Sequence, residues 1–458
     1  MRDLTFHGGR LAAAARLFPH APSPWLDLST GINPHPWTPP ARFAIDQHAL
    51  PAPEALDTLL AAAGAAFGFA GALAAVPGSE IALRLLATLD LPRPWRVVTP
   101  CYRTHRDALP GATPIAADAV EAAAGAGGTL LLANPNNPDG RLFAPERLVQ
   151  VARRLDAHGG VLVIDEAFAD AIDGASILPL LGRHDPVVVL RSFGKFYGLA
   201  GIRLGFVAGM RSVVERIAVL LGGWPVSATA LAYGTAAYRD ADWATAMRTR
   251  LAAEAAALDA LLAAHGFDAR GACPLFRLID TPGAPALFET LAAAAILTRP
   301  FDDAPHRLRL GLPGTAHDRL ATALTSFSRR REPGHADAAA SIETPACLDP
   351  RLRGDDGEGG GPSPSPHGQE PGSAPVAAPP HLHENTREDD ASIASPSSFP
   401  RRRESRHADA SASIDSPAHL YPPRGNDGEG GGPSPSPHGQ EPGSAPVAAP
   451  PHLHENTR

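Results

Sequence analysis

Short apolar runs alternate with amphipathic stretches through the middle of the chain. The runs are of strand length and rich in Val, Leu and Ile, whereas the segments between them carry apolar residues at helical spacing, as in Pro145–His158. The predicted strands are Arg96–Thr99, Thr129–Ala133, Gly160–Ile164, Val187–Arg191 and Leu204–Ala208. Strands that are apolar on both faces and separated by helices are typical of a parallel sheet covered on both sides. The pattern therefore predicts an α/β fold with a mostly parallel, doubly wound sheet.

The pattern changes after about Trp224. The predicted elements are then a helix over Ala244–His265, a strand over Leu275–Asp280, a helix over Ala284–Ala295, a strand over His306–Leu312 and a helix over His317–Phe327. This order indicates a smaller α+β domain, and the proline-containing first forty residues are expected to pack against it. We therefore predict a large domain over about 41–225 and a small domain made of 1–40 and 226–328.

Residues 329–458 have a different composition, dominated by Pro, Gly, Ser and charge. Gly354–Arg387 recurs as Gly425–Arg458 with a single difference, and neither copy has a helical or strand pattern. Such a segment cannot bury enough apolar area to offset its ordering entropy. We predict a disordered tail. Its His381–Glu384 motif could bind a metal, but a solvated tail explains it better, and we expect no metal site.

Charge and cysteine content exclude several classes of protein. The tail has 12 basic and 19 acidic residues and so carries −7 of the formal −8, whereas the remainder has 28 basic and 29 acidic residues. Neither part has the basic balance of a nucleic-acid binder. Cys101, Cys273 and Cys347 are odd in number and far apart, which favours a reducing cytoplasm over a disulfide framework. No apolar stretch suggests a signal peptide or a membrane span.

The chain has one lysine, Lys195, while the other basic residues are arginines. Arginine can replace lysine where only charge is needed, but not where an amine must lose its proton and condense with a carbonyl. A leftover surface lysine is the alternative explanation. The flanking residues favour a covalent role.

Polar residues follow the predicted strands, where open α/β sheets bind ligands. Asn134–Gly140 follows one strand, Asp165 ends the next, and Ser192, Lys195 and Arg203 follow the one after. Pro77–Glu80 precedes a predicted helix, whose free backbone N–H groups suit an anion. Each feature alone has an ordinary explanation as a turn, a helix cap or a surface cation. Together they supply an amine, a carboxylate, an amide and phosphate ligands, which pyridoxal phosphate requires.

Three motifs carry a resemblance to a known family. They are Asn-Pro-Asn-Asn-Pro-x-Gly at 134–140, Asp-Glu-Ala-Phe at 165–168, and Ser-Phe-Gly-Lys-x-x-Gly-Leu-Ala-Gly-x-Arg-x-Gly at 192–205. In order and spacing they resemble the fold-type I aminotransferase superfamily over nearly all of residues 1–328. The resemblance implies a pyridoxal 5'-phosphate enzyme with a large and a small domain.

The resemblance also implies a role for each matching residue. Lys195 would bind the cofactor covalently, Asp165 would keep the pyridine nitrogen protonated, and Tyr102 would stack on the ring. Asn137 would hydrogen-bond the ring oxygen, and Arg309 would bind the substrate α-carboxylate bidentately. The cofactor phosphate would be held by Ser192, Arg203 and the backbone at Ser79 and Glu80. Lys195, Asp165 and Tyr102 are the candidate catalytic residues.

Two positions depart from the family pattern. Family members often have Tyr where this chain has Phe168, so a hydroxyl to the ring oxygen is missing. Many also have Tyr near Leu50, reaching the phosphate of the partner subunit. Both differences weaken the interpretation as a general transaminase.

The N-terminal segments favour one branch of the superfamily. His7-Gly8-Gly9, Leu26–Pro34, Arg299-Pro300-Phe301 and Arg309–Gly314 resemble the threonine-phosphate decarboxylases of cobalamin biosynthesis. This resemblance implies loss of CO2 from L-threonine O-3-phosphate, a phosphorylated amino acid, in a homodimer. His7, Asn33 and Arg299 are then the candidate ligands of the substrate phosphate.

Two alternatives stay open at this point. The first is an aminotransferase of the histidinol-phosphate type, which shares the later motifs and would need 2-oxoglutarate. The second is a non-catalytic binding or regulatory protein on the same fold. A lost lysine or a fused DNA-binding domain would mark the latter, but Lys195 is present and the tail has no helix-turn-helix pattern.

Overall fold

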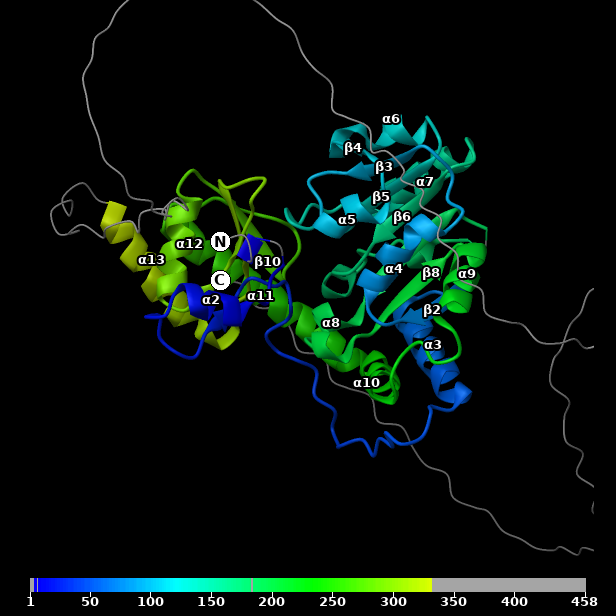
Figure 1. Ribbon diagram of the computed structural model, residues 1–458, viewed down its shortest axis with the longest axis horizontal. Coiled ribbons are helices and arrows are strands. Elements are labelled where there is room, and N and C mark those ends of the chain that lie inside the picture. The colour runs from blue at the N-terminus through cyan, green and yellow to red at the C-terminus, as the bar shows by residue number, and fades with distance from the viewer. Residues whose placement is uncertain (1–3, 6, 183, 332–458) are drawn as a thin grey trace, which may run out of the picture. The chain divides into compact units, whose positions relative to one another are not determined.

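Figure 1 shows the computed structural model of the protein, which describes residues 4, 5, 7–182 and 184–331. Most of the predicted disordered tail, with Cys347 and both copies of the duplicated segment, lies outside the described residues. The predicted boundary after Ser328 falls inside helix α13 (His317–Arg331). The last buried apolar side chain of this helix is Phe327, so the sequence pattern ended one turn before the helix does.

The larger of the described sheets has seven strands in the order β2-β8-β7-β6-β5-β3-β4. Its strands are β2 (Ala72–Val76), β3 (Trp95–Val98), β4 (Thr113–Ile115), β5 (Thr129–Ala133), β6 (Val161–Asp165), β7 (Val187–Ser192) and β8 (Gly205–Gly209). The pairs between β4, β3, β5, β6 and β7 are parallel, and β8 runs antiparallel to both β7 and β2. This confirms the predicted mostly parallel sheet.

Helices cover both faces of this sheet. They are α3 (Pro53–Phe67), α4 (Ser79–Leu85), α5 (Arg103–Ala108), α6 (Val120–Ala124), α7 (Pro145–Asp156), α9 (Arg211–Leu221) and α10 (Ala228–Tyr238). Leu130 and Leu132 of β5 pack in one apolar cluster with α3, α7 and α10, whereas Leu131 packs in a second cluster with α4 and α9. Because successive side chains point to opposite faces, the strand must be apolar throughout, as the sequence is.

Two strands of this sheet were not predicted. The segment Ala72–Val76 is mostly alanine, which carries no strand signal, and its pairing with β8 alone makes it a strand. Thr113–Ile115 is a short, largely exposed edge strand. Tertiary pairing therefore decides both elements, rather than local propensity.

A second sheet has the antiparallel order β12-β13-β10-β9. Its strands are β9 (Ala269–Arg270), β10 (Phe276–Asp280), β12 (Arg299–Pro300) and β13 (Arg307–Gly311), and the helices after the large sheet are α11 (Ala241–Ala264), α12 (Ala284–Ala293) and α13. Near the N-terminus, α2 (Leu11–Leu17) precedes β1 (Leu26–Asp27), which pairs in parallel with β11 (Ile296–Leu297). The N-terminal segment thus joins the smaller sheet region, and the bounds of the two domains stay a prediction.

The carboxyl edge of the large sheet collects the polar residues of interest. Ser79, Tyr102 and Asn137 follow β2, β3 and β5, while Asp165 ends β6 and Lys195 lies in α8 (Phe193–Phe196) after β7. Among the described residues, no helix combines the length and the apolar character that a membrane span requires.

Candidate cofactor and substrate site

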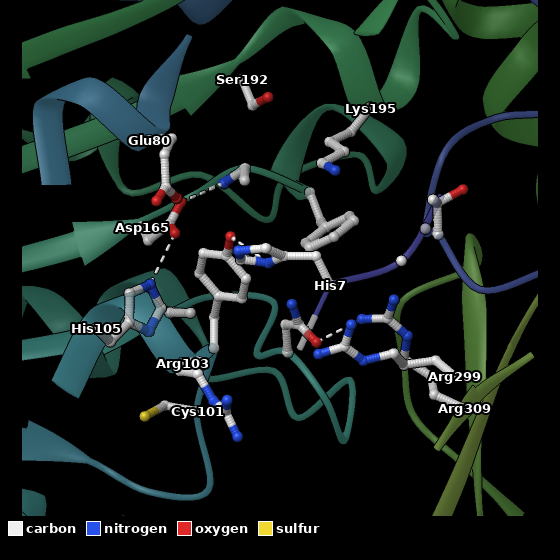
Figure 2. Close-up of a pocket in the computed structure, with 18 of the residues that line it drawn as sticks. His7, Glu80, Cys101, Arg103, His105, Asp165, Ser192, Lys195, Arg299 and Arg309 are labelled. Atoms are coloured by element: carbon white, nitrogen blue, oxygen red, sulfur yellow. Dashed lines mark hydrogen bonds and ion pairs between the residues drawn. The ribbon is translucent and has the colours of Figure 1, made fainter. Parts of the chain in front are cut away.

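A cavity of about 510 Å³ opens at this edge, between the large sheet, β12–β13 and the N-terminal segment. Its volume falls in the range of small-molecule sites. Eleven of the twelve residues predicted from the sequence line it: His7, Ser79, Glu80, Tyr102, Asn137, Asp165, Ser192, Lys195, Arg203, Arg299 and Arg309. Figure 2 shows several of them pointing into the same space. The structure therefore brings together residues separated by up to three hundred positions.

Lys195 extends into this cavity from α8, with its Nζ 5.8 Å from the centre of the Phe168 ring. Burial, followed by the positive charge of Arg309, lowers the pKa of Lys195 to about 8. Arg203 acts in the same direction, and Asp165 opposes it. An amine with this pKa is partly neutral near pH 7, as a nucleophile toward a carbonyl must be.

Asp165 is hydrogen-bonded on both sides. Its Oδ2 lies 2.8 Å from Nε2 of His105, and its Oδ1 accepts the backbone N–H of Ala167 at 3.0 Å. His105 is buried, and although burial opposes its protonation, the hydrogen bond and charge of Asp165 and the contact with Cys101 raise its pKa to about 9. A protonated His105 stabilises the negative charge of Asp165 in the low-dielectric interior.

His105 was missed at the sequence level. It follows Tyr102 by three residues, so the two rings lie on one side of the first turn of α5, with centroids 5.7 Å apart. That spacing next to a predicted ring-stacking Tyr was the available signal.

A small cradle lies at the start of α4. A Cβ added at Gly78 would come within 2.6 Å of Nη2 of Arg203, and one added at Gly205 would come within 2.6 Å of the backbone nitrogen of Ser79. Only glycine therefore lets the guanidinium and the helix start approach the same space. The cradle presents a cation and helical N–H groups, which together suit a phosphate.

Tyr102, His7 and Asn137 line the same cavity. Burial raises the pKa of Tyr102 to about 12, so its phenol stays neutral; its Oη lies 3.4 Å from Nδ1 of His7. Asn137 Oδ1 accepts a hydrogen bond of 2.5 Å from Nη1 of Arg309. This bond fixes the amide and leaves its Nδ2 as the donor on the other side.

Arg299 and Arg309 lie side by side on adjacent strands of the smaller sheet. They are direct partners in the antiparallel register of β12 and β13, and both are buried. Burial lowers the pKa of Arg299 to about 10 and, with the charge of Arg299, that of Arg309 to about 9, so both remain cations near neutral pH. Arg309 also donates to the carbonyl of Ser29 at 2.8 Å. Two buried like charges side by side form a site for anions.

Asn33 is the predicted residue that the structure does not bring to the cavity. Its Nδ2 donates to the carbonyl of Phe196 at 2.8 Å, and its Oδ1 accepts the backbone N–H of His35 at 2.9 Å. Its own backbone N–H donates to the carbonyl of Lys195 at 3.0 Å. Asn33 therefore holds the α8 backbone around Lys195, and the assignment as a phosphate ligand is replaced by this role.

A buried charge cluster beneath the cavity was also missed. Arg191, one residue before Ser192, donates to Glu166 at 2.8 Å, to Ser176 at 3.0 Å and to Asp170. Glu166 directly follows Asp165. The cluster thus links the ends of β6 and β7 through the residues next to two predicted cofactor ligands. One guanidinium thus serves two buried carboxylates, and burial raises the pKa of Glu166 against the opposing charge of Arg191.

The two departures from the family pattern can now be placed. Phe168 is buried and packs edge-on against Phe276, with ring centres 5.1 Å apart. Phe168 thus gives this part of the cavity wall an apolar ring where a tyrosine would give a hydroxyl. Leu50 is 67% exposed and lines a second hollow together with Arg203.

The residues present fit pyridoxal phosphate. A half-buried amine of lowered pKa, a charged carboxylate, an aromatic face, a fixed amide and a phosphate cradle line one cavity of suitable size. The two arginines of β12 and β13 lie beyond these groups and remain for a substrate.

The capture of the cofactor should depend on pH with a midpoint near 8. Only the neutral amine can react, so the rate at which the cofactor-free protein acquires visible absorbance should rise as pH increases through about 8 and fall about tenfold per unit below it. Substituting Arg309→Met removes a cation that lowers the pKa of Lys195 and should shift the midpoint upward. Arg211→Met, on the exposed face of α9, is the matched control. A common midpoint in all three proteins would contradict the assignment.

Comparison with known proteins agrees with this geometry. The model of the class I and II aminotransferases matches residues 113–327. A threonine-phosphate decarboxylase of Pseudomonas aeruginosa is 39% identical over 335 residues, which are 72% of this chain and 99% of the relative. One from Sinorhizobium is 40% identical over 325 residues, covering 69% of this chain and 97% of the relative.

A solved structure shares the fold. The chain is similar to histidinol-phosphate aminotransferase from Sinorhizobium meliloti in complex with pyridoxal-5'-phosphate, with a TM-score of 0.55 and 23% identity, covering 62% of this chain and 84% of the other. The predicted fold-type I architecture is thereby confirmed. From the site and from both kinds of similarity, the chain belongs to the pyridoxal phosphate-dependent threonine-phosphate decarboxylase family, within the class I and II aminotransferase fold.

Proposed function

We propose that this enzyme decarboxylates L-threonine O-3-phosphate to (R)-1-aminopropan-2-yl phosphate, as a step of cobalamin biosynthesis. The observation that carries the proposal is the buried pair Arg299 and Arg309, held opposite each other in the cavity. Two cationic sites at a fixed, short spacing suit a small substrate with one carboxylate and one phosphate. The two relatives named threonine-phosphate decarboxylase support the same substrate, since the match to this chain covers nearly their full length.

The two arginines would hold the two ends of the substrate. The fork of Arg309, oriented by Asn137 and the carbonyl of Ser29, can bind the carboxylate bidentately. Arg299 and His7 would bind the phosphate, since both line the cavity. Burial, followed by the positive charge of Arg299, lowers the pKa of His7. With both ends fixed, the substrate amine faces Lys195, and the orientation decides which bond at Cα breaks.

The reaction replaces CO2 at Cα by one proton. Bound pyridoxal phosphate supplies the electron sink for the pair that CO2 leaves behind. Asp165, charged and supported by His105, would keep a proton on the pyridine nitrogen. Lys195, with its pKa near 8, is protonated for most of the time at pH 7 yet releases a proton readily, and we assign to it the return of the proton to Cα.

A homodimer completes the proposal. Leu50, Trp224 and Val219 are large apolar side chains that are more than half exposed. Leu50 and Trp224 line a second hollow that shares Arg203 with the cofactor cavity. A second copy covering this surface would close the phosphate cradle from outside.

The cytoplasm is the compartment we infer, because the described Cys101 and Cys273 are free thiols.

Product analysis tests the proposed function. Purified protein with pyridoxal phosphate is given L-threonine O-3-phosphate without any keto acid, and CO2 and aminopropanol phosphate should form over many turnovers. The Lys195→Ala variant serves as the blank. If instead nothing forms, while histidinol phosphate and 2-oxoglutarate together yield glutamate, the protein is an aminotransferase and the proposal is wrong. Failure of both reactions would favour a non-catalytic protein on this fold.

A further inference from the structure

Two ion pairs cross the mouth of the cavity. Arg103 donates through Nη2 to both carboxylate oxygens of Asp302, at 2.7 and 2.9 Å, and Arg106 Nη2 lies 3.0 Å from Oδ2 of Asp303. The two arginines are three residues apart on α5, and the two aspartates are consecutive in the turn after β12. All four residues line the cavity. The two arginines therefore face the two aspartates across the opening, the first with the first and the second with the second.

Each side of this contact lies next to a residue of the site. Arg103 directly follows Tyr102, the predicted stacking residue, and Asp302 follows Arg299 by three positions. Tyr102 belongs to the loop after β3 of the large sheet, whereas Arg299 belongs to β12 of the smaller one. The ion pairs thus connect the cofactor side of the cavity to its substrate side.

The contact is strong enough to bias a conformation and weak enough to open. The side chains of Arg103 and Asp302 are 34% and 45% exposed, and those of Arg106 and Asp303 are 51% and 53% exposed. Exposed pairs contribute little individually and are screened by salt. Arg103 contacts both carboxylate oxygens of Asp302 through one nitrogen, and the second pair reinforces this contact; because all four side chains are partly exposed, water can separate both pairs without leaving a buried charge.

We propose that Arg103–Asp302 and Arg106–Asp303 form a clasp that closes the cavity over the substrate by holding the Arg299 turn against α5. The four residues are positioning residues: they act through Tyr102 and Arg299 and exclude water from the reaction. In its choice of substrate the inference rests on the proposed function. The closing itself depends only on the cavity and the two ion pairs.

The first experiment separates binding from chemistry. The double variant Asp302→Asn/Asp303→Asn keeps shape and removes both charges. We expect KM for L-threonine O-3-phosphate to rise roughly tenfold, with kcat reduced less than twofold. Glu215→Gln, which removes an exposed ion pair on α9, is the matched control and should change neither. Each single change, Arg106→Asp or Asp303→Arg, should raise KM. The double variant Arg106→Asp/Asp303→Arg, which reverses the ion pair, should bring KM most of the way back to the wild-type value.

The second experiment does not depend on the substrate. Hydroxylamine destroys the visible absorbance of lysine-bound pyridoxal phosphate, and its rate reports how easily a small molecule enters the cavity. In the wild type this rate should increase several-fold from low to high salt, while the double variant should react fast at both. Equal rates in the two proteins at low salt, or no recovery on charge reversal, would overturn the clasp. Absence of decarboxylation with the expected hydroxylamine pattern would leave the clasp standing and refute the proposed substrate.

Discussion

Replacing Lys195 by alanine should nearly abolish turnover and remove the absorbance band of the lysine-bound cofactor. Alanine has no amine to form the covalent bond or to return the proton to Cα, and the chain has no second lysine to take over. We expect a loss of more than about a thousandfold in kcat, on the scale seen when a principal catalytic group is removed. The absorption spectrum and the CO2 release rate of the purified variant measure the two effects separately.

The informative companion is Lys195→Arg. Arginine keeps the charge but cannot be deprotonated in a protein, so it should be as inactive as alanine and equally without the absorbance band of the lysine-bound cofactor. Reduction with borohydride before digestion should attach the cofactor to the peptide containing Lys195 in the wild type only. Visible absorbance that persists in Lys195→Ala would remove this residue from the mechanism.

The substitution Asp165→Asn should reduce kcat by roughly two to four orders of magnitude. An amide cannot hold a proton on the pyridine nitrogen by charge. The same change should act on His105, because the hydrogen bond and charge of Asp165 are what raise its pKa to about 9 against the effect of burial. In the variant the pKa of His105 should fall, since burial still lowers it and only the contact with Cys101 still raises it.

An NMR titration of His105 measures this second effect without any turnover. The protonation of His105 also makes the free energy of unfolding depend on pH in a defined direction. Because the folded pKa of His105 is raised, the stability it contributes is complete below about pH 6.5 and is lost as pH rises through about 9. The free energy of unfolding of the wild type should therefore fall across this window relative to Asp165→Asn. Identical pH profiles in the two proteins would show that the pair is not coupled.

The sequence predicted what is local along the chain. Lys195, Asp165 and Asn137 lie in continuous motifs directly after strands, and parallel strands bring their carboxyl ends to one edge. The apolar runs also predicted five of the seven strands of the central sheet to within a residue or two, because a strand buried on both faces is apolar throughout.

What depends on pairing across the fold was not predictable in the same way. His105 becomes important through Asp165, sixty residues away, and its spacing from Tyr102 indicates a shared side of α5 but not that contact. The register that sets Arg299 opposite Arg309 is a property of two strands together. Asn33 lies in a segment that resembles the family, but a resemblance does not say whether an amide faces a ligand or the backbone. β2 is recognised as a strand only by its partner β8.

The arginines of β12 and β13 have a consequence for how such an enzyme could diversify. The predicted contacts to the cofactor, apart from the substrate arginines, come from the edge of the seven-stranded sheet, whereas Arg299 and Arg309 belong to a single hairpin of the other sheet. A shift of one residue in the pairing of that hairpin would turn one guanidinium out of the cavity and alter the length of diacid accepted. The predicted cofactor contacts of the large sheet would be undisturbed if Arg299 is the residue that turns out, because Asn137 and Lys195 interact with Arg309. Exchanging this one hairpin between relatives would thus be a way to change the range of substrates.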